Sequence, residues 1–334
     1  MQTYGHIIDG VEVPSVNGGT MPDIDPYTRE PWATIACGTK ADADAAVAAA
    51  RRAFDSGPWP HLGYEKRQQL MHRLADLMTE HADELAMADT RDMGKPITQS
   101  RHDVARSIWN VRFFADHARM TTSEVYPMDT GHHAYTRLDP AGVAVAISPW
   151  NFPLMLSTWK VMPALAWGNT VVLKPAEDTP VSATITARLA TQAGFPPGVF
   201  NVVHGYGPDS VGSALTENPD VDRITFTGES STGKAISKVA AANLIPVSLE
   251  LGGKGANLVF DDADLDNAVH WAVEAIFRNA GQVCLAGSRL YVQRGIYEEF
   301  MLRYTHAAEA LVVGDPKDPA TQFSAALASE QHYT

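Results

Sequence analysis

The chain has 334 residues and a formal net charge of −13, with 45% hydrophobic and 19% charged residues. This balance is typical of a soluble globular protein, and the length predicts about two domains at roughly 150 residues each. The negative charge disfavours nucleic acid and anionic membranes as main partners, and no apolar run reaches the length of a membrane span.

The N-terminus and the cysteines predict a cytoplasmic protein. The first ten residues contain neither a basic nor an apolar leader segment, so no signal peptide is expected. The two cysteines, Cys37 and Cys284, are too few for a disulfide framework. We therefore expect a reducing compartment, with Cys37 as a small buried filler and Cys284 as a free thiol.

The first part of the chain predicts helices. Residues 41–54 are rich in alanine and carry two aspartates near their start, where carboxylates favour the helix dipole. A second helical region is predicted over residues 64–89, before a stop signal at residues 93–96. A third, over residues 103–118, places Arg106 on the same face as aromatic side chains at helical spacing.

From residue 141 short β-branched runs alternate with helical segments. The predicted strands are residues 143–148, 170–173, 200–204, 223–227 and 247–249, and the predicted helices are residues 179–193, 208–216 and 230–241. Such alternation predicts right-handed βαβ units and an α/β fold with a doubly wound parallel sheet, as in Rossmann-like domains.

Polar and glycine residues follow these strands. Asn151, Lys174, Gly207, Gly228 and Glu250 each come directly after a predicted strand. Because ligands bind at the carboxyl ends of strands in doubly wound sheets, we expect one shared site there.

A second domain is predicted after residue 253. A strand at residues 256–260 and a helix at 265–279 are followed by a strand at 290–293 and a helix from Tyr297. We place a cofactor domain at residues 1–253, with residues 122–140 as an excursion. The catalytic domain begins at residue 254 and continues to residue 334.

Three motifs carry reactive groups. Cys284 lies among small and polar residues, Asn151 lies in a turn before Phe152, and Glu250 ends an apolar strand before two glycines. Together they supply a nucleophile, an oxyanion donor and a base. Burial at a strand end would raise the pKa of Glu250 toward a value useful for a base. Taken singly, each also fits a structural role: an inert thiol, a turn residue and a surface carboxylate.

This constellation resembles the NAD(P)-dependent aldehyde dehydrogenase superfamily over nearly the whole chain. Residues 99–117 and 156–160 resemble its 2-hydroxymuconic and 5-carboxymethyl-2-hydroxymuconic semialdehyde dehydrogenase branch. The resemblance implies that Cys284 attacks an aldehyde, that Asn151 holds the oxyanion, and that Glu250 activates water to hydrolyse the thioester. It also implies an oligomerisation hairpin at residues 122–140 and a homodimer or homotetramer. The family continues past the point where this chain stops, with a Glu-Φ-Phe-Gly-Pro motif, so the catalytic domain is expected to be truncated.

The resemblance also implies a dinucleotide site. Its residues are Ser148, Trp150, Lys174, Glu177, Gly207, Phe226, Gly228, Ser230, Gly233 and Leu251. A carboxylate at Glu177 would accept from the ribose hydroxyls and repel a 2′-phosphate, which favours NAD over NADP. Glu229 stands where serine is common, and a carboxylate near a pyrophosphate is unfavourable unless it points away.

Three residues are predicted to contact the substrate: Arg106, Phe152 and Trp159. By register with the family, Arg106 lines the substrate tunnel, where its guanidinium could clamp a substrate carboxylate. The substrate would then be a carboxylated semialdehyde from aromatic catabolism. A solvated arginine on a helix face is the alternative reading.

Other functions stay open at this point. A general aliphatic or betaine-type aldehyde dehydrogenase and a catalytically incomplete cofactor-binding fragment both fit the motifs. Residues 228–234 also match the spacing of a P-loop nucleotide hydrolase, but Ala235 stands where that loop needs a serine or threonine for Mg²⁺. The histidines form no ligand cluster, so no metal site is predicted.

Overall fold

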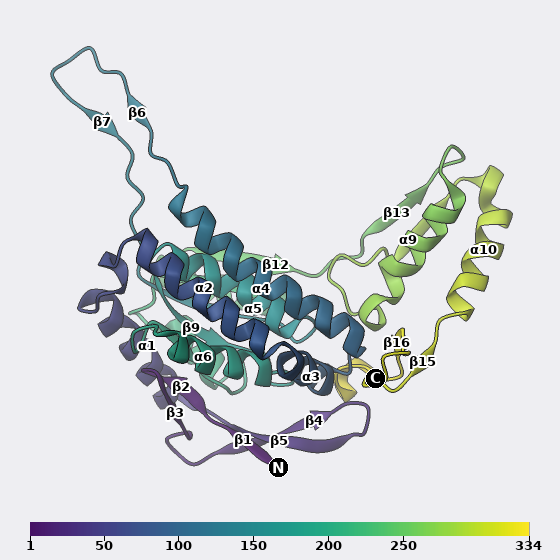
Figure 1. Cartoon of the computed structure of the whole chain (residues 1–334), viewed down its shortest axis with the longest axis horizontal. Coiled ribbons are helices and arrows are strands. Elements are labelled where there is room, and N and C mark those ends of the chain that lie inside the picture. The colour runs from purple at the N-terminus through teal and green to yellow at the C-terminus, as the bar shows by residue number, and fades with distance from the viewer. Residues whose placement is uncertain (334) are drawn as a thin grey trace.

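A computed structural model describes residues 1–333, and a seven-stranded sheet forms its centre (Figure 1). The strand order is β12-β11-β8-β9-β10-β2-β3. The parallel strands are β8 (Val143–Ile147), β9 (Thr170–Lys174), β10 (Phe200–Val202), β11 (Arg223–Gly228) and β12 (Val247–Leu251). The antiparallel strands β2 (His6–Ile8) and β3 (Val11–Val13) extend one edge.

The connections wind the sheet in two directions. From β8 the chain passes to β9 and β10 on one side, then crosses back to β11 and β12 on the other. All residues of β8, β9 and β10 are buried, as expected for strands covered on both faces. The predicted α/β fold with a doubly wound, Rossmann-like parallel sheet is therefore confirmed.

Helices cover both faces of this sheet with separate apolar cores. One core packs α1 (Lys40–Asp55), α7 (Val211–Glu217) and α8 (Ser230–Ala242) against the strands. The other packs α2 (Tyr64–Glu80), α3 (Ala82–Met93), α4 (Ile97–Arg119), α5 (Pro153–Ala166) and α6 (Val181–Ala193). A smaller sheet of β1 (Gln2–Tyr4), β5 (Glu30–Ala36) and β4 (Thr20–Asp25) lies below α3 in Figure 1.

Several helix predictions need correction. The region 64–89 is two helices, α2 and α3, because the backbone of His81 leaves the helical conformation (φ −101°, ψ 18°). Helix α4 begins at Ile97, before the predicted residue 103, directly after Pro96. Helix α5 was not predicted, because it is buried on nearly all sides and therefore lacks the periodic polar face that marks a surface helix.

Two parts extend from the body and diverge, one to the upper left and one to the upper right of Figure 1. One is an exposed hairpin, with β6 (Val125–Tyr126) paired antiparallel to β7 (Ala134–Tyr135) within the predicted excursion. Its role in oligomerisation stays a prediction. No helix among the described residues has both the length and the apolar character that crossing a membrane requires.

The second extension carries the cysteine. In it β13 (Ala256–Val259) pairs in parallel with β14 (Arg289–Val292), and α9 (Leu265–Phe277) packs beside α10 (Tyr297–Glu309). We call residues 254–312 the cysteine lobe and residues 1–253 the sheet lobe. The chain then turns back through β15 (Val313–Gly314), β16 (Phe323–Ser324) and α11 (Glu330–Tyr333). A domain boundary at residue 254 stays a prediction.

Candidate active site

The predicted site residues gather at the carboxyl edge of the parallel sheet. Lys174 is the last residue of β9, and Gly228 is the last residue of β11. Glu250 lies near the end of β12, where it pairs with Thr227 of the neighbouring strand. Asn151 follows β8, the strand between β9 and β11. Neighbouring parallel strands therefore bring these residues to one edge of the sheet.

A direct hydrogen bond joins the Asn151 turn to the cysteine loop. The Asn151 side-chain amide donates to the backbone carbonyl of Gln282 at 2.9 Å, two residues before Cys284. The Asn279 amide donates to the Asn151 carbonyl at 2.9 Å and to the Gln282 carbonyl at 3.2 Å. The structure thus brings Asn151 and the Cys284 loop together, although they are far apart in sequence. The Asn151 side-chain oxygen is buried without a hydrogen-bond partner among the described residues.

The backbone leading to Cys284 is unusual. Asn279, Ala280 and Gly281 have φ angles of 53°, 55° and 76°, so three consecutive residues occupy the left-handed region. For a residue such as Ala280 this conformation costs about 1–3 kcal/mol, and such strain concentrates at functional sites. This stretch follows the end of α9 at Phe277, and Cys284 lies exposed at a turn three residues after it. No acceptor among the described residues takes the Cys284 backbone N–H, which leaves this donor available.

The glycines after Glu250 allow the β12 segment to pass beside the cysteine loop. A side chain at Gly255 would place its Cβ 3.0 Å from the carbonyl oxygen of Ala286, and one at Gly253 would lie 3.8 Å from that of Cys284. Glycine therefore permits this close approach of two backbones. The third candidate, Glu250, lies on the same segment as these glycines.

Glu250 is exposed, which corrects the expectation that it is buried at the end of its strand. Its carboxylate accepts no hydrogen bond within residues 1–333, but it lies within electrostatic range of Lys160 on α5. Burial lowers the pKa of Lys160 to about 8, and the negative charge of Glu250 acts in the opposite direction. The Lys160 ammonium donates to the Thr225 hydroxyl of β11 at 3.2 Å. The sequence analysis assigned no role to Lys160, although a lysine within a mostly apolar segment indicates a buried cation.

A buried charge network supports the turn that holds Asn151. The Lys95 ammonium, fully buried, lies 2.6 Å from an Asp103 carboxylate oxygen and 3.8 Å from the centre of the Phe152 ring. The other Asp103 oxygen lies 3.3 Å from the guanidinium of Arg278, six residues before Cys284. The Phe152 ring centre is 6.0 Å from the same guanidinium. The Phe152 ring therefore lies near two cations, one from each lobe.

The other two predicted substrate residues are exposed. The Arg106 guanidinium stacks over the ring of Trp109 at 4.1 Å on α4. Trp159 is about half exposed on α5. Among the residues that the structure describes, the hydrogen bonds to residues 279–284 come from other side chains than Arg106 and Trp159. Arg278 was missed by the sequence reasoning, although it lies within the same motif region as Cys284. All three substrate assignments stay predictions.

The residues predicted to hold the dinucleotide flank the same edge. Ser148 is buried and accepts a hydrogen bond from the Ser157 hydroxyl at 2.9 Å. The Trp150 ring centre lies 4.1 Å from that of His332. Lys174 is buried, and its ammonium contacts the Glu177 carboxylate at 3.1 Å. Glu177 keeps 39% of its side chain exposed, so this carboxylate can still accept from a ligand.

Glycines allow close packing at the end of β11 and within the first turns of α8. A Cβ at Gly228 would lie 2.6 Å from the ring of Phe226, and one at Gly233 would lie 2.9 Å from the side chain of Leu251. Both values are too short for any other residue without a shift. A Cβ at Gly207 would meet open space, so a ligand can approach that backbone. Such close helix–strand packing and open backbone are what a dinucleotide site requires.

The backbone geometry after β11 excludes the P-loop interpretation. β11 ends at Gly228 and α8 begins at Ser230, so only Glu229 separates strand from helix. A phosphate-cradling loop of several residues is therefore not formed. The nearby Gly233 lies within α8, where it packs against β12.

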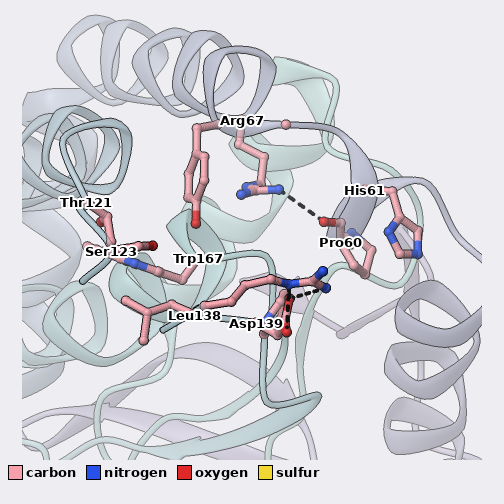
Figure 2. A pocket seen from close by; sticks show the side chains of 12 residues that line it. Pro60, His61, Arg67, Thr121, Ser123, Leu138, Asp139 and Trp167 are labelled. Carbon is pink, nitrogen blue, oxygen red and sulfur yellow. Dashed lines mark hydrogen bonds and ion pairs between the residues drawn. The ribbon is translucent and has the colours of Figure 1, made fainter. Parts of the chain in front are cut away.

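A cavity of about 380 Å³ lies at the foot of the hairpin, away from these residues (Figure 2). It is lined by Arg67, Arg137, Leu138 and Trp167, among others, and by none of the predicted site residues. The buried Arg67 guanidinium donates to the Ala166 carbonyl at 3.0 Å, at the C-terminal end of α5. A cation there favours the helix dipole, so Arg67 has a structural role that needs no ligand.

Comparison with known proteins identifies the family. The model of the aldehyde dehydrogenase family matches residues 13–334. A 2-hydroxymuconic semialdehyde dehydrogenase of Pseudomonas sp. strain CF600 is 46% identical over 99% of this chain and 69% of its own length. The NAD-dependent aldehyde dehydrogenase of Sinorhizobium meliloti superposes with a TM-score of 0.97 at 38% identity, over 99% of this chain and 66% of that chain.

An aldehyde dehydrogenase of Bacillus cereus, solved as its NAD⁺ complex, superposes with a TM-score of 0.96 at 39% identity, over 98% of this chain and 67% of that chain. The chain spans between 58% and 69% of the length of the curated relatives it matches. The predicted enzyme class and cofactor, an NAD-dependent oxidoreductase acting on aldehydes, are confirmed at the level of the family. The chain belongs to the aldehyde dehydrogenase family.

Proposed function

We propose that this protein oxidises an aldehyde to a carboxylic acid with NAD, using Cys284 as the nucleophile. The observation that carries the proposal is the 2.9 Å hydrogen bond from the Asn151 amide to Gln282. It places an amide donor of the sheet lobe beside the loop of an exposed thiol. A carbonyl carbon at the sulfur would have its oxygen within reach of two donors, the Asn151 amide and the Cys284 backbone N–H.

The first half of the reaction forms and oxidises a thiohemiacetal. The Cys284 thiolate attacks the aldehyde carbon, and the carbonyl oxygen takes up the negative charge opposite the two donors. A bound NAD would supply the acceptor for the hydride that leaves this carbon. A thioester on Cys284 remains, and the carbonyl oxygen stays within the same pair of donors.

The second half releases the acid by hydrolysis. Glu250 takes a proton from water, and the resulting hydroxide attacks the thioester carbon so that the Cys284 sulfur departs as a thiolate. Lys160 lies within electrostatic range of Glu250, so its ammonium stabilises the charged carboxylate. The exposure of Glu250 lets it exchange the proton with solvent. The net change is aldehyde, NAD⁺ and water to carboxylic acid, NADH and a proton.

The described residues fit a bound NAD. Glu177, held by Lys174, would accept from the adenosine ribose hydroxyls, and its charge would repel a 2′-phosphate. The open backbone at Gly207 would lie along the adenine side. Gly228, Ser230 and Gly233 would hold the pyrophosphate at the start of α8, with Phe226, Ser148, Trp150 and Leu251 lining the same crevice.

The test of the catalytic assignment is the Cys284→Ala variant. Aldehyde-dependent NADH formation should fall to background, while the affinity for NADH in a fluorescence titration stays unchanged. Turnover within about tenfold of the unaltered chain would remove Cys284 from its role. NADH binding without any turnover in the unaltered chain would instead favour a cofactor-binding function.

We further propose that the aldehyde carries a carboxylate, which Arg278 rather than Arg106 recognises. Arg278 is 40% exposed, so part of its guanidinium faces outward beside Phe152, while Asp103 fixes its orientation. Arg278 also lies only six residues before Cys284 in the sequence. Arg106 instead stacks over the ring of Trp109 on its own helix. A similar protein from Pseudomonas is named for a semialdehyde that bears a carboxylate.

The two arginines can be separated by matched variants. Arg278→Ala and Arg106→Ala are compared on a dicarboxylic-acid semialdehyde and on the neutral aldehyde of the same chain length. Loss of a charge-assisted hydrogen bond should raise KM for the charged substrate about 10- to 100-fold in Arg278→Ala only. Equal losses on both substrates would mean that Arg278 does not read a carboxylate.

A homo-oligomer and a cytoplasmic location stay proposals as well. The hairpin exposes Val125, Tyr126 and Tyr135, an apolar surface that a second copy could cover.

A further inference from the structure

The start of α8 lies at the sheet's carboxyl edge, directly after β11, and its first turn is exposed. α5 starts at Pro153, which lacks an N–H, and the first N–H of α6, from Val181, is bound by the buried Asp92 carboxylate at 3.0 Å. α8 has 13 residues, and Ser230, Ser231 and Thr232 of its first turn are exposed. An exposed helix N-terminus after a strand favours phosphate groups.

A carboxylate already occupies that end. Glu229 is the N-cap residue of α8, and its side chain accepts from the Ser231 backbone N–H at 3.3 Å. The Ser231 hydroxyl donates to the other carboxylate oxygen, and Lys234 is the nearby cation. These hydrogen bonds lower the pKa of Glu229, so it stays charged throughout the neutral range. One of the N–H groups that a phosphate would use is therefore taken by an anion of the chain itself.

We infer that Glu229 weakens the binding of dinucleotide by competing with the pyrophosphate for the N-terminus of α8. The inference rests on the proposed NAD site and adds a residue that sets its affinity. A bound pyrophosphate must either share the helix end with a carboxylate or displace it from Ser231. In both cases the negative charge opposes the ligand, and the opposition decreases as salt screens it.

The test compares Glu229→Ser with Glu229→Gln in the whole chain, by fluorescence titration with NADH. Serine and glutamine both remove the charge, and serine is a favoured N-cap, so α8 should keep its helical circular dichroism. Each variant should bind NADH about three- to tenfold more tightly at low ionic strength, and the gain should shrink as salt is added. Glu217→Gln is the matched control, because this exposed carboxylate lies at the C-terminal end of α7.

A second ligand separates the pyrophosphate from the rest of the site. Adenosine, which lacks phosphates, should displace NADH from the Glu229 variants with its own affinity unchanged. An unchanged or weaker affinity for NADH in both variants would overturn the inference while leaving the NAD site intact. A wild-type chain that fails to bind NADH would overturn the proposed function and the inference together.

Discussion

The sheet lobe and the cysteine lobe differ most in how completely their elements are buried. Every residue of β8, β9 and β10 is buried, whereas β13 buries only Val259 and α10 only Phe300. Large apolar side chains are exposed across the cysteine lobe: Leu258, Phe260, Trp271, Leu285, Tyr291 and Leu302. The core of the cysteine lobe holds only a few buried side chains. The curated relatives are longer than this chain.

The difference shows how the site is held together. The amide of Asn151 is fixed by a dense lobe, but Cys284 belongs to the lobe with little core of its own. Polar contacts between the two lobes, which we call the seam, position Asn151 relative to Cys284. They join Asn151 to Gln282, Gln99 to Asn279, and Asp103 to Arg278. Directional polar contacts between the two lobes therefore help to position the site.

Hydrogen exchange tests whether the two lobes differ in local stability as they differ in burial. Amides of β8 and β9 should be protected about 10³-fold more than those of β13, β14 and α10, because thin cores open locally at low free energy. Mass spectrometry of peptic peptides from the unaltered chain would report both regions together. Equal protection in the two lobes would show that the cysteine lobe is stabilised by contacts other than its own core.

Replacing Lys95 should produce the largest loss of stability. Lys95→Met leaves Asp103 and Asp89 without their buried cation, so the free energy of unfolding should fall by about 3–5 kcal/mol. The urea midpoint of the sheet lobe would measure it. Arg101→Ala is the control, because its pair with Asp83 is exposed and is worth less than about 1 kcal/mol. A loss in Lys95→Met no larger than in the control would mean that the buried pair is not stabilising.

The buried acid Asp89 predicts how stability depends on pH. Burial raises the pKa of Asp89 to about 6, so the folded state binds this proton more tightly than the unfolded state does. Its contribution is complete below about pH 4 and is lost as the pH rises through about 6. The loss is on the order of 2–3 kcal/mol.

Asp89→Asn should flatten this part of the profile, measured by urea unfolding at about pH 4 and about pH 7. The exposed carboxylate of Asp83 supplies the control, since Asp83→Asn should leave the slope unchanged. An identical slope in wild type and Asp89→Asn would assign the pH dependence to other groups, such as Asp23, whose pKa burial raises to about 7.

The smallest expected effect concerns the seam. The Gln99 side chain accepts from the Asn279 backbone N–H at 3.0 Å and donates to the Gln322 carbonyl at 3.2 Å. Gln99→Ala should cost about 1 kcal/mol of stability and reduce kcat more than the affinity for NADH, because the loop before Cys284 loses a contact. Gln68→Ala, whose bond to Asp116 stays within the sheet lobe, should change neither value. A drop in NADH affinity alone would place the effect of Gln99 in the sheet lobe.

Sequence periodicity predicted the parallel strands well because they are short, buried and β-branched. The residues at their ends, such as Lys174 and Gly228, could be placed at one edge for the same reason. Helix α5 escaped prediction because it is apolar on most sides, and the break at His81 escaped because no glycine or proline marks it. Cys37 is half-buried rather than buried, since it packs at the margin of the core.

The sequence by itself determined the family motifs, the doubly wound sheet and the chemistry of thiol, amide and carboxylate, because local patterns and residue types carry that information. Only the tertiary structure decided which groups meet: Asn151 with the loop of Cys284, Lys160 near Glu250, and Arg278 with Asp103 beside Phe152. The exposure of Glu250 and the capping role of Glu229 were decided there as well. Contacts and burial arise from long-range packing, which no local pattern in the chain specifies.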